Sequence, residues 1–337
     1  MKQRANVVAL LRRAQAQGIC LDAVSEGGEW VFERLQVHRH EGKTRAVMKI
    51  QEGCDRFCAY CIIPSVRGPL RYMALGDVQS EAQRLASEGY KEIVITGIHL
   101  ASYGRGISTD GDRRPTLMDA IKVVHDTEGI ARVRLGSLEP PLITEDFAKQ
   151  LARLPKLCPQ FHLSMQSGSA EVLRRMGRRY DPAGYMAAVE RLREAFPRCA
   201  ITTDVLTGFP GETEKEAMET LRFVEDVGFA RIHVFPYSRR EGTRAGSMAD
   251  QVPEEAKKRR AAELIGLGNQ LEERFVNEMV GSQTAVLMEE QLPDGLCAGY
   301  SPEYVRVVAA SRPGALANVL IERAEKDTAY GKEVDSQ

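Results

Sequence analysis

Hydrophobic and polar residues follow two different rhythms along the chain, and the change between them divides it into a larger and a smaller region. From residue 45 to residue 279, short apolar runs alternate with longer stretches in which apolar residues recur at helical spacing. This pattern predicts strands at residues 45–50, 91–96, 131–135, 161–165, 200–206 and 231–235. It predicts helices at residues 77–87, 117–127, 145–154, 170–196 with a break at Pro182, 214–227 and 254–279.

Each predicted strand is followed by a predicted helix, which gives six strand-then-helix units. Strands joined through helices are expected to be parallel, with right-handed crossovers. Because a full barrel of this type needs eight units, we predict an α/β fold with a partial (β/α)6 TIM-like barrel. In such barrels the chemistry lies at the C-terminal ends of the strands. The polar and glycine-rich segments fall there, at residues 54–61, 96–99, 137–140, 166–169, 208–213 and 236–238.

Beyond residue 281 the rhythm changes to short strand-like runs without helices between them. These runs lie at residues 284–289, 296–300, 304–309 and 317–324, separated by turns that contain proline and glycine. Four or five short strands in about 55 residues predict a small all-β barrel of the oligonucleotide-binding (OB-like) type. The opening of the chain is a predicted helix at residues 4–17 and an irregular polar stretch, together too small for a core of their own. The expected boundaries are residues 1–39, 40–272 and 273–337.

Composition restricts the function more than the fold. The chain has 337 residues and a formal net charge of −1, so no global basic excess argues for nucleic acid, although a local patch still can. No apolar run approaches the roughly 18–20 residues that cross a bilayer, and the N-terminus lacks the apolar core of a signal peptide. We therefore expect a cytoplasmic protein with reduced thiols, in which clustered cysteines indicate metal rather than disulfides.

Three of the seven cysteines, Cys54, Cys58 and Cys61, fall in the loop after the first predicted strand. Three thiolates can hold three corners of a four-iron four-sulfur cluster and leave the fourth iron without a protein ligand. The alternative is a zinc site, but zinc usually takes four protein ligands, often as two pairs, and no fourth ligand lies near in the sequence. The spacing therefore favours one [4Fe-4S] cluster with an open iron. The remaining cysteines are scattered singly and are expected to be small apolar residues: Cys20, Cys158, Cys199 and Cys297.

With Tyr60 before the last cysteine and a strand before the first, this loop resembles that of the radical S-adenosylmethionine (SAM) superfamily. The resemblance implies that the amino and carboxylate groups of SAM chelate the open iron. It also implies that one electron from the cluster splits the sulfonium to give a 5′-deoxyadenosyl radical, while the protein positions the cofactor and excludes water. The cofactor-binding residues that it implies are Tyr60, Thr96, Gly97, Gln166, Ser167, Arg179 and Asp204.

Further segments resemble the methylthiotransferase branch of this superfamily, at residues 44–54, 62–68, 96–104, 166–169, 178–180 and 208–213. The resemblance runs from about residue 40 to the end, and the C-terminal strands are similar to the TRAM barrel, the RNA-binding domain of these enzymes. Residues 97–100, 137–140 and 239–243 are most similar to the enzymes that methylthiolate C2 of N6-threonylcarbamoyladenosine at tRNA position 37. The branches that act on isopentenyladenosine in tRNA or on a ribosomal-protein aspartate fit less well.

The same resemblance implies partners. We expect the TRAM barrel to hold the tRNA anticodon arm through phosphate and stacking contacts of Tyr304, Arg306 and Arg312. We also expect a flavodoxin- or ferredoxin-type reducing protein, and a monomer.

Members of this family carry, ahead of these regions, a domain whose three cysteines hold a second [4Fe-4S] cluster, which relays or donates the inserted sulfur. Only Cys20 precedes Cys54 in this chain. We therefore expect residues 1–39 to be the remnant of that domain, and the chain to cleave SAM without completing sulfur insertion. The alternative is a non-catalytic RNA-binding remnant.

Several of these segments have a structural explanation beside the functional one. In residues 208–213, glycine and proline make a tight turn, and Thr213 with Glu216 predicts a capping box on the next helix, which is favoured over cofactor contact. Residues 166–168 either face the barrel mouth or satisfy a turn, and His99 is either a cleft residue or a packed one. The basic run at residues 257–260 predicts a solvated helix face rather than an RNA patch.

Overall fold

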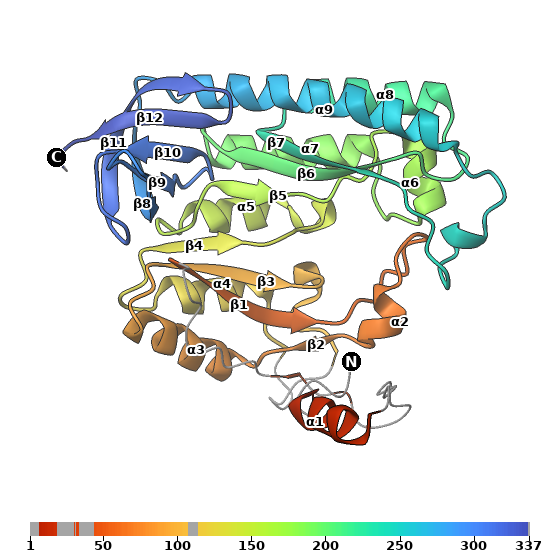
Figure 1. The fold of residues 1–337 in the computed structure, drawn as a ribbon, viewed down its shortest axis with the longest axis horizontal. Coiled ribbons are helices and arrows are strands. Elements are labelled where there is room, and N and C mark those ends of the chain that lie inside the picture. Colours follow the sequence, from red (N-terminus) through yellow and green to blue (C-terminus); the bar gives the residue numbers. More distant parts are fainter. Residues whose placement is uncertain (1–6, 19–29, 31, 34–43, 107–113, 336–337) are drawn as a thin grey trace.

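The six predicted strands form one curved parallel arrangement in the structure, a computed structural model that describes residues 7–18, 30, 32–33, 44–106 and 114–335 (Figure 1). Neighbouring strands pair in parallel within two sheets, which are joined by single bridges from Val133 to Leu157 and from Leu138 to Leu163. The first and last strands of this series do not pair with each other in the described part of the chain, so the barrel is open, as predicted. In spatial order the strands are β1 (Arg45–Glu52), β3 (Glu92–Gly97), β4 (Arg132–Leu135), β5 (Gln160–His162), β6 (Ala200–Thr207) and β7 (Arg231–Pro236).

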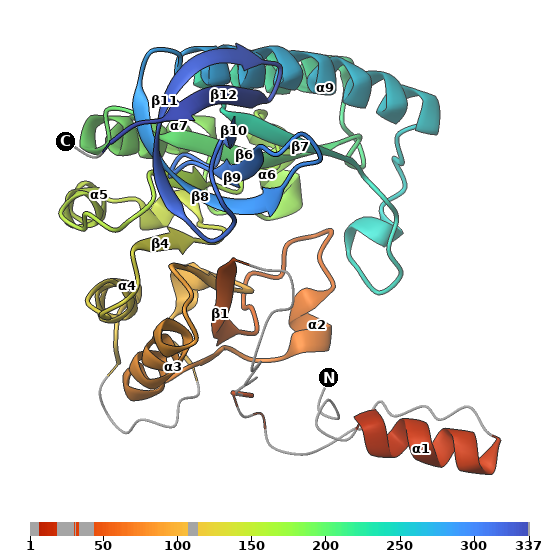
Figure 2. The ribbon, with the colours of Figure 1, turned by 60° about the vertical axis from the view of Figure 1, so that its left-hand side comes forward.

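Helices lie on the convex side of these strands (Figure 2). Pro182 divides the long predicted helix as expected, because it takes the first turn of the second half, where a helix needs no backbone N–H. Apolar side chains such as Ile93 and Ile95 are fully buried beneath the helices and belong to the main core. The helices are α3 (Leu75–Ser87), α4 (Leu117–His125), α5 (Glu145–Ala152), α6 (Ala170–Met176), α7 (Pro182–Ala195), α8 (Glu214–Val227) and α9 (Glu254–Asn277).

Two details of the barrel differ from the prediction. A short helix, α2 (Ile63–Arg67), and an antiparallel edge strand, β2 (Arg71–Tyr72), follow the cysteine loop. Strand β5 ends at His162, although Gln166 N–H still donates to Asp204 O at 2.9 Å. Gln166 has φ +70°, a left-handed conformation that is uncommon outside glycine, so the chain turns sharply at this strand end.

The C-terminal region is a closed five-stranded barrel, as predicted. Its strands are β8 (Gln283–Gln291), β9 (Cys297–Tyr300), β10 (Arg306–Ala309), β11 (Leu316–Glu325) and β12 (Thr328–Glu333). Residues such as Val286, Val307 and Val319 are fully buried and form a separate small core. The sequence pattern does not predict the last strand, because Thr328–Glu333 contains few apolar residues that would mark its inner face.

This small barrel docks on the N-terminal ends of the core strands, at the left in Figure 1. Arg132 donates to Tyr300 O at 3.0 Å, and Arg134 donates to Pro302 O at 2.9 Å. Tyr304 stacks on Tyr300 with ring centroids 4.8 Å apart. The guanidinium groups of Arg45 and Arg134 lie 5.0 and 4.7 Å from the Tyr304 ring centre. The Tyr304 ring is therefore packed in the contact between the two barrels, and its expected stacking on RNA stays a prediction.

The N-terminal helix prediction is confirmed by α1 (Val7–Gln17), which contains no buried residue. The guanidinium of Arg71 lies 4.9 Å from the centre of the Trp30 ring, so Trp30 packs beside β2. Cys20 lies outside the described residues. In the described ranges, no helix has both the length and the apolar character that a bilayer crossing requires.

Candidate functional site

The three clustered cysteines lie in the loop that leaves the C-terminal end of β1. Cys58 is buried, whereas Cys54 and Cys61 are partly exposed. Ala59 ties this loop to the rest of the barrel, because its N–H donates to Met176 O at 2.8 Å and its carbonyl accepts from Ala245 N–H at 2.7 Å. Strain is present at the apex, where Phe57 has φ +47° and a side chain that is 68 % exposed. The loop is thus tied to the rest of the barrel, with the thiols of Cys54 and Cys61 partly exposed.

Burial raises the pKa of the Cys54 and Cys61 thiols, and their neighbouring cysteines raise it further. The free thiols are therefore protonated at neutral pH, and a metal that binds them must displace protons. No group of three or more His, Cys, Asp or Glu side chains among the described residues converges tightly enough for a single metal ion. A four-iron cluster does not require such convergence, because each cysteine binds a different iron.

A buried carboxylate, Glu139, gathers the charged side chains around this loop. Its Oε2 lies 2.8 Å from His99 Nε2 and 3.0 Å from Arg56 Nη2. Its Oε1 lies 3.5 Å from Arg178 Nη2. Burial alone would raise the pKa of Glu139, but the hydrogen bond from His99 and the charges of Arg178 and Arg56 outweigh it and lower that pKa. Glu139 is therefore ionised, and His99 is a packed residue of the site.

Arg178 links this carboxylate to the cysteines. Its Nη1 donates to Cys58 Sγ at 3.3 Å, and its Nε donates to Tyr180 Oη at 2.9 Å. Its Nη2 is buried and makes no hydrogen bond, although it forms the ion pair with Glu139 Oε1 at 3.5 Å. An anionic group beside Cys58 would satisfy this nitrogen, so the residues present fit both a thiolate-bound cluster and a carboxylate-bearing cofactor.

The implied cofactor residues of the middle strands lie at the C-terminal ends of β3, β5 and β6. Thr96 and Gly97 end β3, and a Cβ on Gly97 would come within 2.8 Å of Gln51 Cβ, so only glycine allows this close approach. Gln166 and Asp204 are joined through their backbones, and the Asp204 carboxylate lies 3.4 Å from His162 Nε2. These four residues remain candidates for cofactor contact.

The other cofactor residues that the family resemblance implies, Tyr60, Ser167 and Arg179, lie in different surroundings. Tyr60 is half-buried and packs against the apolar group that includes Met176 and Phe209. Ser167 is fully buried, and its hydroxyl lies 3.0 Å from Thr220 Oγ1 on α8, which supports a structural role. Arg178, the neighbour of the implied cofactor residue Arg179, donates a hydrogen bond to Cys58 Sγ. The proposed cofactor contact of Arg179 stays a prediction.

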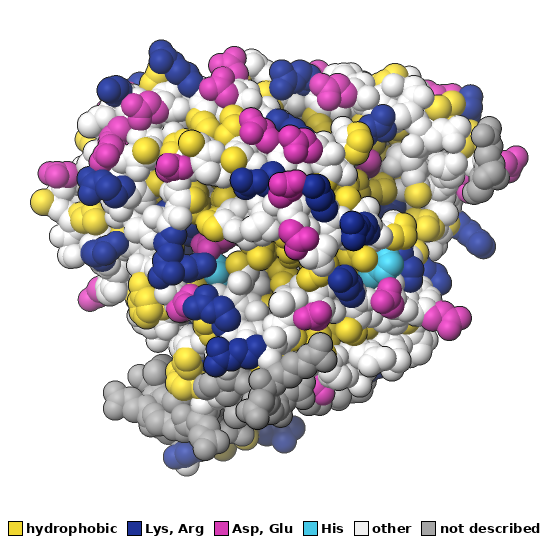
Figure 3. Space-filling model, turned by 180° about the vertical axis from the view of Figure 1, so that it is seen from behind, with side chains coloured by type: hydrophobic (Ala, Val, Ile, Leu, Met, Phe, Trp, Pro, Cys, Tyr) yellow, Lys and Arg dark blue, Asp and Glu magenta, His cyan; other side chains and the backbone are white. Residues whose placement is uncertain are grey.

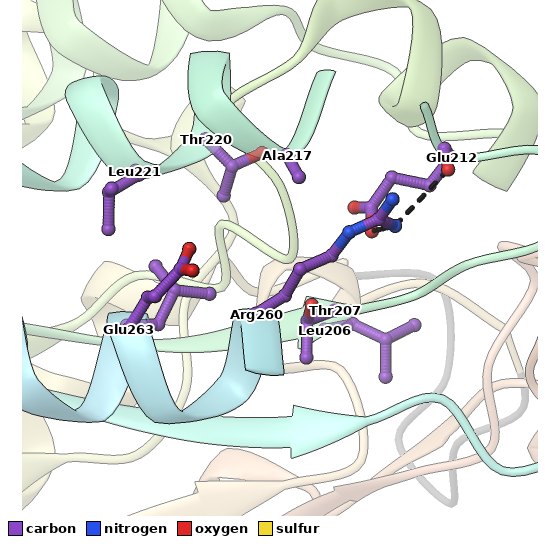
Figure 4. Close-up of a pocket in the computed structure, with 9 residues that line it drawn as sticks. Leu206, Thr207, Glu212, Ala217, Thr220, Leu221, Arg260 and Glu263 are labelled. Atoms are coloured by element: carbon purple, nitrogen blue, oxygen red, sulfur yellow. Dashed lines mark hydrogen bonds and ion pairs between the residues drawn. The ribbon is translucent and has the colours of Figure 1, made fainter. Parts of the chain in front are cut away.

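Residues 208–213 form a structural turn. The predicted capping box is present, with the Thr213 hydroxyl accepting from Glu216 N–H at 3.2 Å. Glu212 is buried and pairs with Arg260 on α9 at 2.8 Å (Figure 4). The adjoining cavity has a volume of about 10 Å³, room for roughly one water molecule and far too small for SAM.

The expectation of a solvated face at residues 257–260 is wrong for two of the four side chains. Lys257 and Arg260 are only 4 % and 5 % exposed. Lys257 Nζ donates to Tyr237 O at 3.0 Å, and Arg260 pairs with Glu212. These cations tie α9 to the ends of β7 and β6. Such contacts are not predictable from the sequence, because their partners lie far away in the chain.

Three residues that matter to the site were not singled out from the sequence: Arg56, Glu139 and Arg178. Each lies within a segment that was noted, but a charged residue in a loop after a strand does not reveal which neighbour it meets. Their convergence on Cys58 and His99 depends on the spatial order of β1, β3, β4 and β5. The one available signal was the position of Arg56 and Glu139 beyond strand ends, whereas Arg178 follows helix α6.

Comparisons with known proteins agree with this geometry. The model of the radical SAM superfamily matches residues 48–224. The curated protein "Threonylcarbamoyladenosine tRNA methylthiotransferase MtaB" from Bacillus subtilis is 40 % identical over 282 residues, which cover 82 % of this chain and 62 % of that protein. The MtaB of Chlamydia pneumoniae is 35 % identical, with 89 % and 70 % covered. The chain thus spans about two thirds of the length of these relatives.

A second group of relatives carries a different substrate in its name. The "tRNA-2-methylthio-N(6)-dimethylallyladenosine synthase" of Clostridium botulinum is 37 % identical over 266 residues, covering 79 % of this chain and 58 % of that protein. Among solved structures, the radical SAM methyltransferase TsrM from Kitasatospora setae superposes with a TM-score of 0.50 at 18 % identity, over 60 % of this chain and 38 % of that one. This likeness supports the fold alone. The chain belongs to the radical SAM superfamily and, within it, to the methylthiotransferase family.

Proposed function

We propose that the chain acts in the methylthiolation of C2 of N6-threonylcarbamoyladenosine at position 37 of tRNA, by radical SAM chemistry. The observation that supports this substrate most directly is the identity to three relatives named MtaB, at 40 %, 39 % and 35 %. The relatives named for dimethylallyladenosine reach 37 % over a shorter stretch. That nucleoside is the second candidate substrate.

In this proposal Cys54, Cys58 and Cys61 hold three irons of a [4Fe-4S] cluster. Such a cluster with an open iron, when bound, supplies the electron that splits SAM and yields the 5′-deoxyadenosyl radical. Arg178 offers its buried Nη2 to an anionic group beside Cys58. Thr96, Gly97, Gln166 and Asp204 line the strand ends where SAM is proposed to lie, while Arg179 and Tyr60 remain candidates from the family resemblance.

The small barrel is proposed to hold the anticodon arm. Arg312 is exposed, and the half-buried Arg306 lies 3.7 Å from Glu290, so these two expected RNA contacts stay candidates. The eight residues of β1 separate the docked barrel from the cysteine loop by roughly 26 Å, at about 3.3 Å per residue. An anticodon arm bound at the small barrel must therefore run along the core barrel to bring its base to the mouth.

Charge on one face of the molecule does not favour a broad RNA-binding surface there. On the side opposite to the view of Figure 1, Lys and Arg side chains are interspersed with Asp and Glu (Figure 3). We expect a few separate phosphate contacts rather than a continuous basic band. A flavodoxin- or ferredoxin-type donor for the cluster completes the proposal, in the cytoplasm where thiols stay reduced.

The substrate is tested by deleting the gene and analysing tRNA nucleosides by mass spectrometry. We expect loss of 2-methylthio-N6-threonylcarbamoyladenosine and retention of its unmethylthiolated precursor. Loss of the methylthiolated dimethylallyladenosine instead would favour the second substrate. Unchanged tRNA would refute both, and would direct the search to a protein substrate.

The radical chemistry is tested separately on the purified chain. After cluster reconstitution and chemical reduction with SAM, we expect 5′-deoxyadenosine to form. A chain that binds RNA but produces no 5′-deoxyadenosine would be a non-catalytic RNA-binding protein.

A further inference from the structure

We propose that Arg178 sets the reduction potential of the cluster by donating a hydrogen bond to the Cys58 sulfur, and that Glu139 partly offsets this effect. The inference rests on the proposed function, since it requires the cluster on Cys54, Cys58 and Cys61. Arg178 acts through a ligand rather than on a reacting atom, so it is a positioning residue.

The geometry around Arg178 leaves little freedom to the guanidinium. Its side chain is 8 % exposed, and that of Glu139 is 10 % exposed. The guanidinium lies over the Tyr180 ring at 4.9 Å, and Nε donates to the Tyr180 hydroxyl. That hydroxyl in turn donates to Ser164 O at 2.5 Å, which fixes the tyrosine to the end of β5. These contacts together hold the guanidinium so that Nη1 points at Cys58 Sγ.

The sulfur that Arg178 contacts becomes a thiolate ligand when it binds iron. A thiolate is a better acceptor, so this N–H···S bond strengthens when the cluster is present. Hydrogen bonds to the sulfurs and the net charge of the surroundings are among the main factors that set the potential of iron–sulfur clusters. Because reduction adds an electron to a site of low dielectric, a fixed cation and a donated hydrogen bond both favour the reduced form.

Glu139 has the opposite influence. It is a buried anion that pairs with Arg178 at 3.5 Å, and its pKa is lowered, so it keeps its charge. Removing that charge makes reduction easier, whereas removing Arg178 makes it harder. Substitutions of the two residues should therefore shift the reduction potential in opposite directions, whereas a general loosening of the loop would not.

Arg174 provides a matched control for the loss of one positive charge. It lies on α6, four residues before Arg178, and pairs with Glu171 at 2.8 Å. Its side chain is 72 % exposed, so water and salt screen it from the cysteine loop.

The experiment uses the whole chain, reconstituted with iron and sulfide, as wild type, Arg178→Met, Arg178→Lys, Glu139→Gln and Arg174→Met. Iron per chain is measured first, and the cluster is then titrated with redox mediators, without SAM, by electron paramagnetic resonance. For Arg178→Met we expect the ratio of reduced to oxidised cluster at the wild-type midpoint to fall about tenfold, which is a decrease of about 59 mV for one electron. Arg178→Lys keeps the positive charge but lacks the planar guanidinium, so its potential should lie between those of the wild type and Arg178→Met. Glu139→Gln should raise the ratio severalfold, and Arg174→Met should leave it within about twofold.

Each outcome decides one point. Equal potentials in wild type, Arg178→Met and Glu139→Gln overturn the inference, as do shifts of the same sign in both. If Arg178→Met does not retain its cluster, Arg178→Lys and Glu139→Gln carry the test, and a potential unchanged in both overturns it. A wild-type chain that binds no four-iron cluster refutes the proposed function itself, which is a different result from equal potentials. A weaker affinity for SAM without any change in potential would assign Arg178 to cofactor binding alone.

Discussion

The two ends of the core barrel are built around the same kind of charge cluster, yet they differ in how completely it is satisfied. At the base, Glu92 is fully buried and pairs with Arg132 at 3.3 Å and Arg134 at 2.8 Å. Both arginines also donate to backbone carbonyls of the small barrel, and neither leaves a buried nitrogen without a hydrogen bond in the described structure. At the mouth, Glu139 and Arg178 are almost as buried, but Arg178 Nη2 lacks a hydrogen bond.

Buried charged groups are stable when they are paired, and both clusters meet this condition. A missing hydrogen bond is not by itself the mark of a ligand site, because Arg260 Nε also lacks one within the structural pair with Glu212. The contact that distinguishes the mouth is the hydrogen bond from Arg178 Nη1 to Cys58 Sγ at 3.3 Å.

The largest expected effect lies at the mouth. Cys58→Ala should abolish cluster binding, because two thiolates cannot replace three ligands. The reconstituted variant should lack the brown absorbance and form no 5′-deoxyadenosine. Cys199→Ala is the control, since that cysteine is buried away from the loop and should leave both properties intact. A Cys58→Ala variant that keeps its absorbance would contradict the ligand assignment.

At the base, Glu92→Gln should lower the free energy of unfolding by about 3–5 kcal/mol, because it leaves two buried arginines without a counter-charge. Urea unfolding measures this change. The cluster content per folded chain should not change, since the cysteine loop is at the other end of β1. A loss below 1 kcal/mol would show that the base cluster does not stabilise the docking of the small barrel.

Substitutions of Arg312 and Tyr304 distinguish RNA binding by the small barrel from its docking on the core barrel. Arg312→Ala should weaken tRNA binding severalfold and reduce the dependence of log K on log salt by about one unit, with unchanged stability. Tyr304→Ala should instead lower the unfolding midpoint, because its ring packs under Arg45 and Arg134. Filter binding at several salt concentrations and thermal unfolding distinguish them. If Tyr304→Ala weakens RNA binding without lowering the unfolding midpoint, the packing of that ring does not stabilise the fold.

The smallest effect concerns acid stability at Glu216. Burial would raise its pKa, but hydrogen bonds from Arg175 and Thr213 lower it from 4.5 to about 2. A carboxylate with a depressed folded-state pKa stabilises the protein above its unfolded pKa and loses this contribution as pH falls from about 4.5 to 2. Glu216→Gln keeps the capping box and should flatten the fall in stability over this range. An unchanged pH profile in unfolding experiments would refute this assignment.

The order of strands and helices was predictable because each element carries its own periodicity. Pro182 and the Thr213–Glu216 capping box are local signals of the same kind, and both are confirmed. The three cysteines were predicted as ligands from their spacing, and that assignment stays a prediction. The buried pairings of Glu139 and of Lys257 were not predictable, because they join residues far apart in sequence and depend on which side chains the fold brings together.

The two single bridges that join the sheet of β4 to the sheet of β5 have a mechanical consequence. Sheets held by full ladders resist separation, whereas a seam with few hydrogen bonds opens at lower free energy. The seam divides the core into two halves: one bears the cysteine loop and Glu139, and the other bears Arg178, Gln166 and Asp204. The loop nevertheless crosses the seam, because Ala59 is hydrogen-bonded to Met176 and Ala245 of the second half. A small widening therefore keeps Cys58 beside Arg178 and stretches the ion pair between Arg178 and Glu139 instead.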